Sequence, residues 1–176
     1  MKKIFLDFLQ ISKITKSKNQ LERELDVKIN LYRGFVELEG EAIAEYTATQ
    51  VIEAITLGFD IQTSLLLKNE DYILQKIQIK DYIGKAKKRL IQVKARIIGK
   101  KGRAIKTISE LSNCSIKLHE NLVAIIGLVS DAETTLDSVI SLIRGSNHSN
   151  VYARLEKLSH EEETDLGLKG NKGNKS

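Results

Sequence analysis

The chain has 176 residues, enough for one medium domain or two small ones, and its hydrophobic fraction of 41% is sufficient for a packed core. Its only cysteine is Cys114, so an internal disulfide and a cysteine-rich zinc cluster are both excluded. The net charge of +5 is compatible with binding to a polyanion, although many soluble proteins are equally basic.

The start of the chain does not have the pattern of a signal peptide, because Asp7 and Gln10 interrupt its apolar run. No stretch approaches the roughly 18 apolar residues of a membrane span. Together with the single cysteine, these patterns favour a reducing, cytoplasmic setting and predict no membrane contact.

The chain contains an internal repeat, with one copy in each half. Each half contains two strand patterns, the second ending near a glycine, and then a helical pattern. Lys28 corresponds to Lys117 and Gly40 to Gly127, so the two halves are related by a nearly constant offset. This indicates that one supersecondary unit has been duplicated.

The unit can be predicted from the spacing of its apolar residues. Ile116 and Leu118 alternate with polar residues, as in a strand that is buried on one face. Val139, Ile140 and Ile143 recur at the spacing of one helix face. Each half is predicted to contain a strand, two helices, two strands and a helix. The expected fold class is α+β, with a three-stranded sheet in each module and helices on one face of it.

Domain boundaries follow from these patterns. The predicted units are a first module at 1–58, a connecting segment at 59–75, a second module at 76–158 and a tail at 159–176. A short helix is expected around 65–67 in the connecting segment. The tail combines glutamates with glycines, lysines and asparagines and has few apolar residues, so we expect it to be disordered.

Basic residues are concentrated in the second module. Between Lys80 and Lys106 there are eleven lysines and arginines and one acid, Asp81. A positive region this local is expected where a protein contacts phosphate groups, although a solvated helix face has the same composition.

The most specific motif, Ile97 to Gly102, lies inside this basic region. Its two glycines allow the backbone to turn sharply and to approach a sugar-phosphate chain, because no Cβ intervenes. A helix is expected to begin at Arg103, and the free N–H groups of its first turn favour an anion. Lys100 and Lys101 add positive charge that contacts phosphate without distinguishing bases.

This motif resembles the signature of KH domains, in which an Ile-Ile-Gly-x-x-Gly loop joins two helices. The resemblance implies that the loop clamps about four nucleotides of single-stranded RNA. It also implies a groove for the bases, with Ile97 or Ile98 as its floor and with Lys117 and His119 beside it. A plain helix–helix turn is the alternative explanation of the glycine spacing.

Further candidates extend this surface along the preceding helix and toward the C-terminus. His148 is interpreted as a helix-start residue or an RNA contact, because the three histidines of the chain form no cluster with metal-ligand or catalytic spacing. Neither catalysis nor a metal or cofactor is predicted. The candidate RNA-binding residues are Gly99, Lys100, Lys101, Gly102, Arg103, Ile97, Ile98, Arg96, Lys106, Lys85, Lys88, Arg89, Lys117 and His148.

The first half lacks the glycine motif. Its corresponding positions, Ile11 to Ile14, contain no glycine, although Lys13, Lys16 and Lys18 could still contact phosphate. The first module is therefore predicted to be degenerate and to serve packing, protein contacts or an accessory RNA surface.

Several segments together resemble one branch of the KH proteins; they are 57–67, 79–85, 96–103 and 144–152. They are similar to the archaeal tandem-KH pre-ribosomal RNA-processing factors, the family called Dim-two or partner of Nob-one in eukaryotes. The resemblance implies two tandem type I KH-like modules, the first of them degenerate, and binding to small-subunit ribosomal RNA near its 3′ end.

The same resemblance implies two protein partners, a Nob-type endonuclease and the alpha subunit of translation initiation factor 2. The expected function is that of a single-stranded RNA-binding factor in ribosome biogenesis. The alternative is a protein-interaction scaffold that recruits the nuclease or the initiation factor, with RNA contact secondary.

Overall fold

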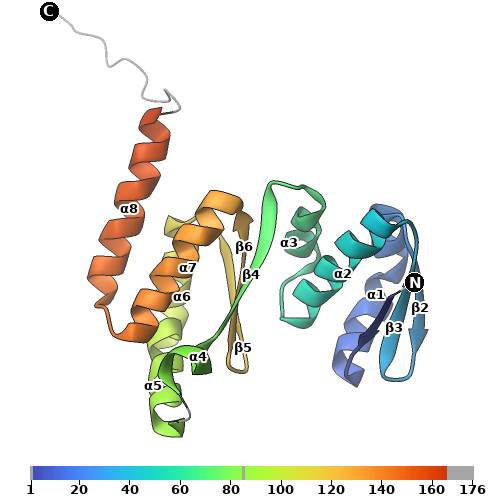
Figure 1. Cartoon of the computed structure of the whole chain (residues 1–176), viewed down its shortest axis with the longest axis horizontal. Helices are drawn as coiled ribbons and strands as arrows, with labels where there is room; N and C mark the ends of the chain where they lie inside the picture. The colour runs from blue at the N-terminus through green and yellow to red at the C-terminus, as the bar shows by residue number, and fades with distance from the viewer. Residues whose placement is uncertain (1, 85, 166–176) are drawn as a thin grey trace, which may run out of the picture.

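Two three-stranded antiparallel sheets organise the chain in the computed structural model, which describes residues 2–84 and 86–165 (Figure 1). The first sheet has the order β1-β3-β2 and consists of β1 (Lys2–Phe5), β2 (Lys28–Tyr32) and β3 (Phe35–Glu39). The second has the equivalent order, β4-β6-β5, and consists of β4 (Tyr72–Gln78), β5 (Ser115–His119) and β6 (Leu122–Leu128). The shared order confirms the α+β class and the repeat.

In the first module one continuous helix, α1 (Phe8–Leu25), joins β1 to β2, and α2 (Ala42–Thr56) follows β3. The prediction of two helices at this point is wrong for the first module. Residues 11–14 lie inside α1, because no glycine interrupts the helix there and its apolar face, including Ile14 and Leu21, stays buried.

The start of α1 is fixed by a reciprocal pair of hydrogen bonds. The side chain of Asp7 accepts a hydrogen bond from the backbone N–H of Gln10 at 2.7 Å, and the Gln10 side chain accepts one from the N–H of Asp7 at 2.9 Å. Such a capping box satisfies two N–H groups that a helix start leaves without partners.

The second module contains the predicted pair of helices before its second strand. Its helical elements are α4 (Ile79–Ile83), α5 (Lys87–Ile98), the short 3-10 turn η2 (Lys100–Gly102), α6 (Arg103–Leu111), α7 (Val129–Arg144) and α8 (His148–Asp165). Val123 and Ile125 of β6 face these helices and form one core with Ile97, Ile108 and Leu142.

Strand β6 is buried on both faces, which joins the two modules. Ala124 and Ile126 point away from Val123 and Ile125 and pack against Ala54 and Phe59 of the first half. Figure 1 shows α2 and α3 (Ile61–Leu65) on this side of the second sheet and α6 and α7 on the other. The second sheet therefore lies between its own helices and the end of the first module.

Two glycines that correspond in the repeat have the same packing role. A Cβ on Gly40 would lie 2.9 Å from Cγ1 of Val27, and a Cβ on Gly127 would overlap the Sγ of Cys114. Val27 and Cys114 are buried residues that directly precede β2 and β5. Each glycine thus leaves space for the chain that enters the neighbouring strand.

The structure moves one predicted boundary. Strand β4 begins at Tyr72 and pairs with β6 along its whole length, so residues 72–75 belong to the second sheet and not to the connecting segment. The rest of the connecting segment contains α3 and the turn η1 (Leu66–Lys68), at the position of the expected short helix. The sequence alone places the start of β4 in a linker because acidic residues precede it.

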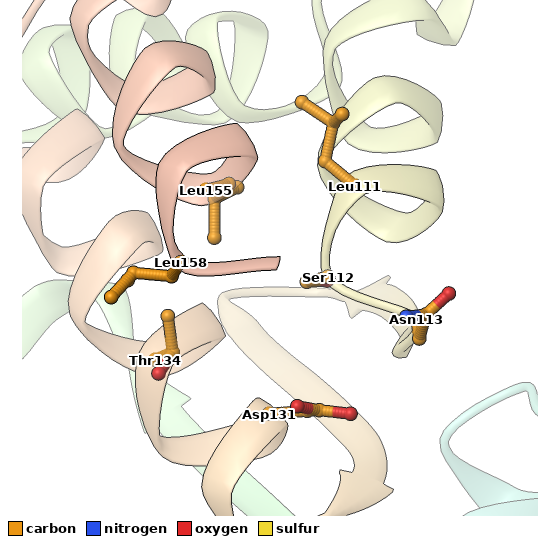
Figure 2. Close-up of a pocket in the computed structure, with 7 residues that line it drawn as sticks. All are labelled: Leu111, Ser112, Asn113, Asp131, Thr134, Leu155 and Leu158. Carbon is orange, nitrogen blue, oxygen red and sulfur yellow. The ribbon is translucent and has the colours of Figure 1, made fainter. Parts of the chain in front are cut away.

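Helix α8 packs against α6 and α7 at the far end of the second module. Figure 2 shows Leu155 and Leu158 of α8 beside Leu111 of α6 and Thr134 of α7, around a cavity of about 20 Å³. That volume is about the size of one water probe, so this cavity is too small for a ligand.

The helix α8 also continues to Asp165, so the prediction of disorder from residue 159 is wrong for its first part. A helix that is anchored by buried Val151 and Leu155 propagates readily, since each added residue forms another hydrogen bond. Residues 166–176 lie outside the described residues.

The contact between the modules can be tested with Phe59, which is 4% exposed. Replacing Phe59 with alanine should lower the free energy of unfolding by about 3–5 kcal/mol, because it leaves a cavity between β6 and the first module. Urea denaturation measures the change. The control is Phe8→Ala, at a side chain that is 84% exposed, which should change the free energy by less than about 0.5 kcal/mol. Equal effects of the two substitutions would contradict the assigned interface.

Candidate nucleic-acid interface

The loop between α5 and α6 enters the left-handed region of backbone conformation three times. The φ angles of Gly99, Lys101 and Gly102 are 73°, 54° and 75°. Glycine adopts such angles without steric cost, whereas a residue with a Cβ loses roughly 1–2 kcal/mol. The strain at Lys101 is of the kind that accumulates at functional sites.

Gly99 is also required by the packing of the loop. A Cβ at this position would lie 2.7 Å from the backbone nitrogen of Ala104, in the first turn of α6. Nothing lies within 4 Å of the equivalent position on Gly102. The first glycine therefore lets the two helices approach, and the second leaves the backbone open to an outside molecule.

The start of α6 is suited to an anion. The N–H of Arg103 donates to the backbone oxygen of Lys100, but no side chain forms a cap hydrogen bond at this helix start. Lys100, Lys101 and Arg103 are exposed around this end, and none of them forms an ion pair among the described residues. Backbone donors and unpaired cations thus occupy one loop, which is the combination that a phosphate group requires.

The remaining basic candidates lie along α5 and α6. Lys88 and Arg89 are exposed in the first turn of α5, whereas Lys85 lies outside the described residues. Lys106 is exposed on α6 and is 3.6 Å from Glu110, one turn later in the helix. An exposed pair of this kind contributes little, so Lys106 can still turn toward a phosphate.

The two isoleucines before the loop have different environments. Ile97 is fully buried in the core of the second module, so it cannot form the floor of a groove. Ile98 is 38% exposed, and Ile91, one heptad earlier on α5, is 69% exposed. Ile91 was not among the residues predicted from the sequence. Its spacing from Ile98 marks a second apolar strip on α5, beside the exposed basic residues.

Arg96 and His148 connect α5 to the start of α8. The guanidinium of Arg96 donates a hydrogen bond to the backbone oxygen of Ser146, and the His148 Nε2 lies 2.9 Å from the backbone oxygen of Arg96. The imidazole also contacts the ring of Tyr152, with 6.0 Å between centroids. These contacts give both side chains a role in positioning α8, and direct contact with RNA stays a prediction.

Lys117 does not lie beside the loop as expected. Its neighbours Ile116 and Leu118 pack on the helices of the second module, so Lys117 points to the opposite face of the sheet. There it lines a groove of about 390 Å³ between the modules, together with Lys13 and Lys16 of α1. The prediction assigned Lys117 to the wrong face of an edge strand.

An acid lies in this groove between the modules. Hydrogen bonds from the backbone and side chain of Thr63 hold the pKa of the Asp60 carboxyl below its usual value, and the charge of Lys117 lowers it further. Asp60 is thus a carboxylate that caps α3, and the three lysines leave the groove with excess positive charge.

The described residues contain no group of three or more histidine, cysteine, aspartate and glutamate side chains that could hold a metal ion. Within the same part of the chain, no helix is long and apolar enough to cross a membrane. Burial raises the pKa of the Cys114 thiol, which packs in the core beside Thr135. A neutral thiol in that position is a packing residue and a poor nucleophile.

Comparison with known proteins identifies the second module as a KH domain. The model of the second KH domain of PNO1, described as a eukaryotic-type KH domain (KH-domain type I), matches residues 73–160. A KH domain-containing protein of Methanocaldococcus jannaschii is 30% identical over 146 residues, covering 80% of this chain and 64% of that protein. The pre-rRNA-processing protein PNO1 of Phaeosphaeria nodorum is 28% identical over 142 residues, covering 77% and 54%.

A solved structure extends the similarity to the first module. It is that of the complex of a/eIF2alpha, aDim2p and rRNA from Pyrococcus horikoshii, with a TM-score of 0.78 and 29% identity, covering 91% of this chain and 94% of that chain. The chain spans only 64% and 54% of the two curated relatives above. The family model spans half of the chain, and the chain therefore belongs to the PNO1 family of type I KH-domain proteins, as its resemblance in sequence implied.

Proposed function

We propose that this protein binds single-stranded RNA and that the loop Gly99 to Gly102 grips the sugar-phosphate backbone. One observation carries the proposal: the loop combines an open glycine backbone, an uncapped helix start and unpaired cations. Each feature is a general device for holding phosphate, and their combination is the mode by which KH domains clamp about four nucleotides. The bases would lie against Ile98 and the exposed strip of α5.

The proposed target is small-subunit ribosomal RNA near its 3′ end, during maturation of the subunit. The names of the relatives support a role in ribosomal RNA processing, and the archaeal neighbour was crystallised with rRNA and an initiation factor subunit. We propose the same initiation factor subunit and a Nob-type endonuclease as protein partners. The protein acts by binding and positioning, and we assign no catalytic step to it.

The inter-module groove supplies an accessory site for a longer strand. Lys13 and Lys16 lie on α1 at and just after the positions that correspond to the glycine loop, and Lys117 faces them from β5. A continuous helix cannot bring its backbone close to a phosphate, but lysine side chains reach a phosphate without it. The first module would thus add charge to RNA binding without a clamp of its own.

The alternative function, a protein scaffold with secondary RNA contact, makes a different prediction for the loop. If RNA contact is secondary, changing the loop should leave the assembly with protein partners and its activity unchanged. The substitutions below separate the two functions, because they remove charge from the loop without altering the other faces of the molecule.

The double substitution Lys100→Asp and Lys101→Asp should lower the affinity for single-stranded RNA by at least about tenfold, equivalent to about 1.4 kcal/mol. Aspartate tolerates the left-handed conformation at position 101, so the loop should keep its shape. Fluorescence titration measures the affinity, and the melting temperature reports the fold. The control is Lys28→Asp with Arg33→Asp, an equal charge change on exposed residues of β2 and of the turn that follows it. Unchanged affinity in the loop variant would refute the clamp.

The basic residues at the start of α5 should contribute equally to the binding of all RNA sequences. Neutralising Lys88 or Arg89 with glutamine should weaken binding and lower the slope of log K against log salt by about 0.7 for each phosphate that the variant no longer neutralises. Titrations of two unrelated oligonucleotides at several salt concentrations measure this. A change in base preference with an unchanged slope would show that these side chains do not bind phosphate.

The accessory groove should matter only for long RNA. Changing Lys13 and Lys16 to glutamate should lower the affinity for a strand that extends well beyond the loop. The affinity for a strand of about four nucleotides, which the loop alone can hold, should not change. Titration of both strands against the full chain tests this. Equal losses for the two lengths, or no loss for either, would contradict a separate phosphate site between the modules.

A further inference from the structure

A second groove lies between the modules, away from the basic residues. It has a volume of about 550 Å³ and is bordered by α2, by the turn η1 with the residues that follow it, and by the first half of β4. From α2 it receives Ile43, Tyr46, Thr47 and Gln50, which have the spacing of a single helix face. Ile43 and Tyr46 are 82% and 64% exposed, so this face of α2 has no partner within the described chain.

The wall opposite α2 is the edge of a sheet. Strand β4 pairs with β6 on one side only, and no other strand of the described structure adjoins its second side. Alternate N–H and C=O groups of its seven residues therefore point outward. The backbone groups of residues 73–78 form no hydrogen bond outside the sheet within the described structure.

This edge lacks the features by which proteins usually protect an edge strand. The sequence contains no proline, and β4 pairs with β6 without a bulge. Its only charged residue, Lys76, is held by Glu53 of α2 at 2.5 Å and lies on the face of the sheet toward the first module. An unprotected edge beside an exposed apolar helix face is the arrangement that accepts an added strand.

The charges beside the groove favour one net charge in an added strand. Lys68 and Glu70 are the charged residues that line the groove, and the acidic rim is completed by Glu41 and Asp71, each within two residues of a lining residue. Lys68 is paired with Glu24 at 3.0 Å, while Glu41, Glu70 and Asp71 are exposed and form no ion pair among the described residues. This surface repels a phosphate backbone and favours a basic partner.

We propose that the groove between α2 and β4 binds an extended segment of a basic protein, which joins the second sheet as a fourth strand beside β4. Only a polypeptide backbone offers the alternating donors and acceptors that match the free edge. An added strand would lie about 4.8 Å beyond β4, and every second side chain would point toward α2. Apolar side chains at those positions meet Ile43 and Tyr46, and a lysine or arginine near the Tyr72 end of β4 meets the acids Glu70 and Asp71.

The loop and this groove serve the two opposite edges of one sheet. Strand β5 is the edge nearer in sequence to the glycine loop, and β4 is the other. A partner strand on β4 leaves the loop unoccupied, so the protein can hold RNA and the basic segment together. This surface does not depend on the proposed RNA site, and each can be disproved alone.

The test uses the full chain and two blocked seven-residue peptides, one alternating valine with lysine and one alternating valine with glutamate. The lysine peptide should slow hydrogen exchange at alternate amides of β4, those that point away from β6, and should bind at least about tenfold more tightly than the glutamate peptide. Replacing Ile43 and Tyr46 with lysine should abolish this protection. The exposed control Phe8→Lys should keep it, and all variants should bind RNA equally.

Three results would overturn the proposal. One is the absence of protection in β4 with the lysine peptide at millimolar concentration. Another is equal binding of the two peptides, which would remove the role of the acidic rim. The third is protection of the same amides by single-stranded RNA, which would make the edge part of the nucleic-acid surface.

Discussion

Burial of strand β6 on both faces is the constraint on which the arrangement of this protein depends. One face packs on the helices that carry the glycine loop, and the other packs on Ala54 and Phe59 at the end of the first module. A strand with one solvent-exposed face would leave the modules as independent units joined by a linker. Here the modules share a core, so Lys117 faces Lys13 and Lys16, and α2 faces β4, at fixed positions. Both inter-module grooves follow from this one packing choice.

The two copies of the repeat differ at the positions of the glycine loop, where the backbone conformation of the second copy is unfavourable for residues other than glycine. In the second module the connection from α5 to α6 places Gly99, Lys101 and Gly102 in the left-handed region, which ends one helix and starts another. In the first module the same positions continue as helix, with Ile14 buried and Lys13 exposed. A loop of this kind removes helical hydrogen bonds and places a lysine in the left-handed region. Its replacement by a helix agrees with the different role that we propose for the first module.

Several features could be predicted from the sequence because they depend on local chemistry. Glycine spacing located the loop, alternation located β5, and the repeat predicted a similar three-stranded sheet in each module. The errors share one cause, which is that they concern packing between distant segments. The faces of β5 could not be assigned without knowing what covers the sheet, so Lys117 was placed on the wrong side. Likewise Ile97 and Ile98 look equivalent in sequence, and only the rotation of α5 separates a buried side chain from an exposed one.

Basic and acidic residues are segregated along the chain, which the net charge of +5 does not reveal. The basic region belongs to the helices and loop that precede β5, whereas the exposed acids Glu41, Glu70 and Asp71 lie at the start of α2 and at the entry to β4. Because β4 and β5 are the two edges of one sheet, the acids at the entry to β4 and Lys117 of β5 belong to opposite edges. In the functions that we propose, a polyanion is attracted to the basic loop and repelled from the acids beside β4. Under these two proposals, the charge pattern leaves the RNA to the glycine loop and reserves the β4 edge of the sheet for a basic ligand.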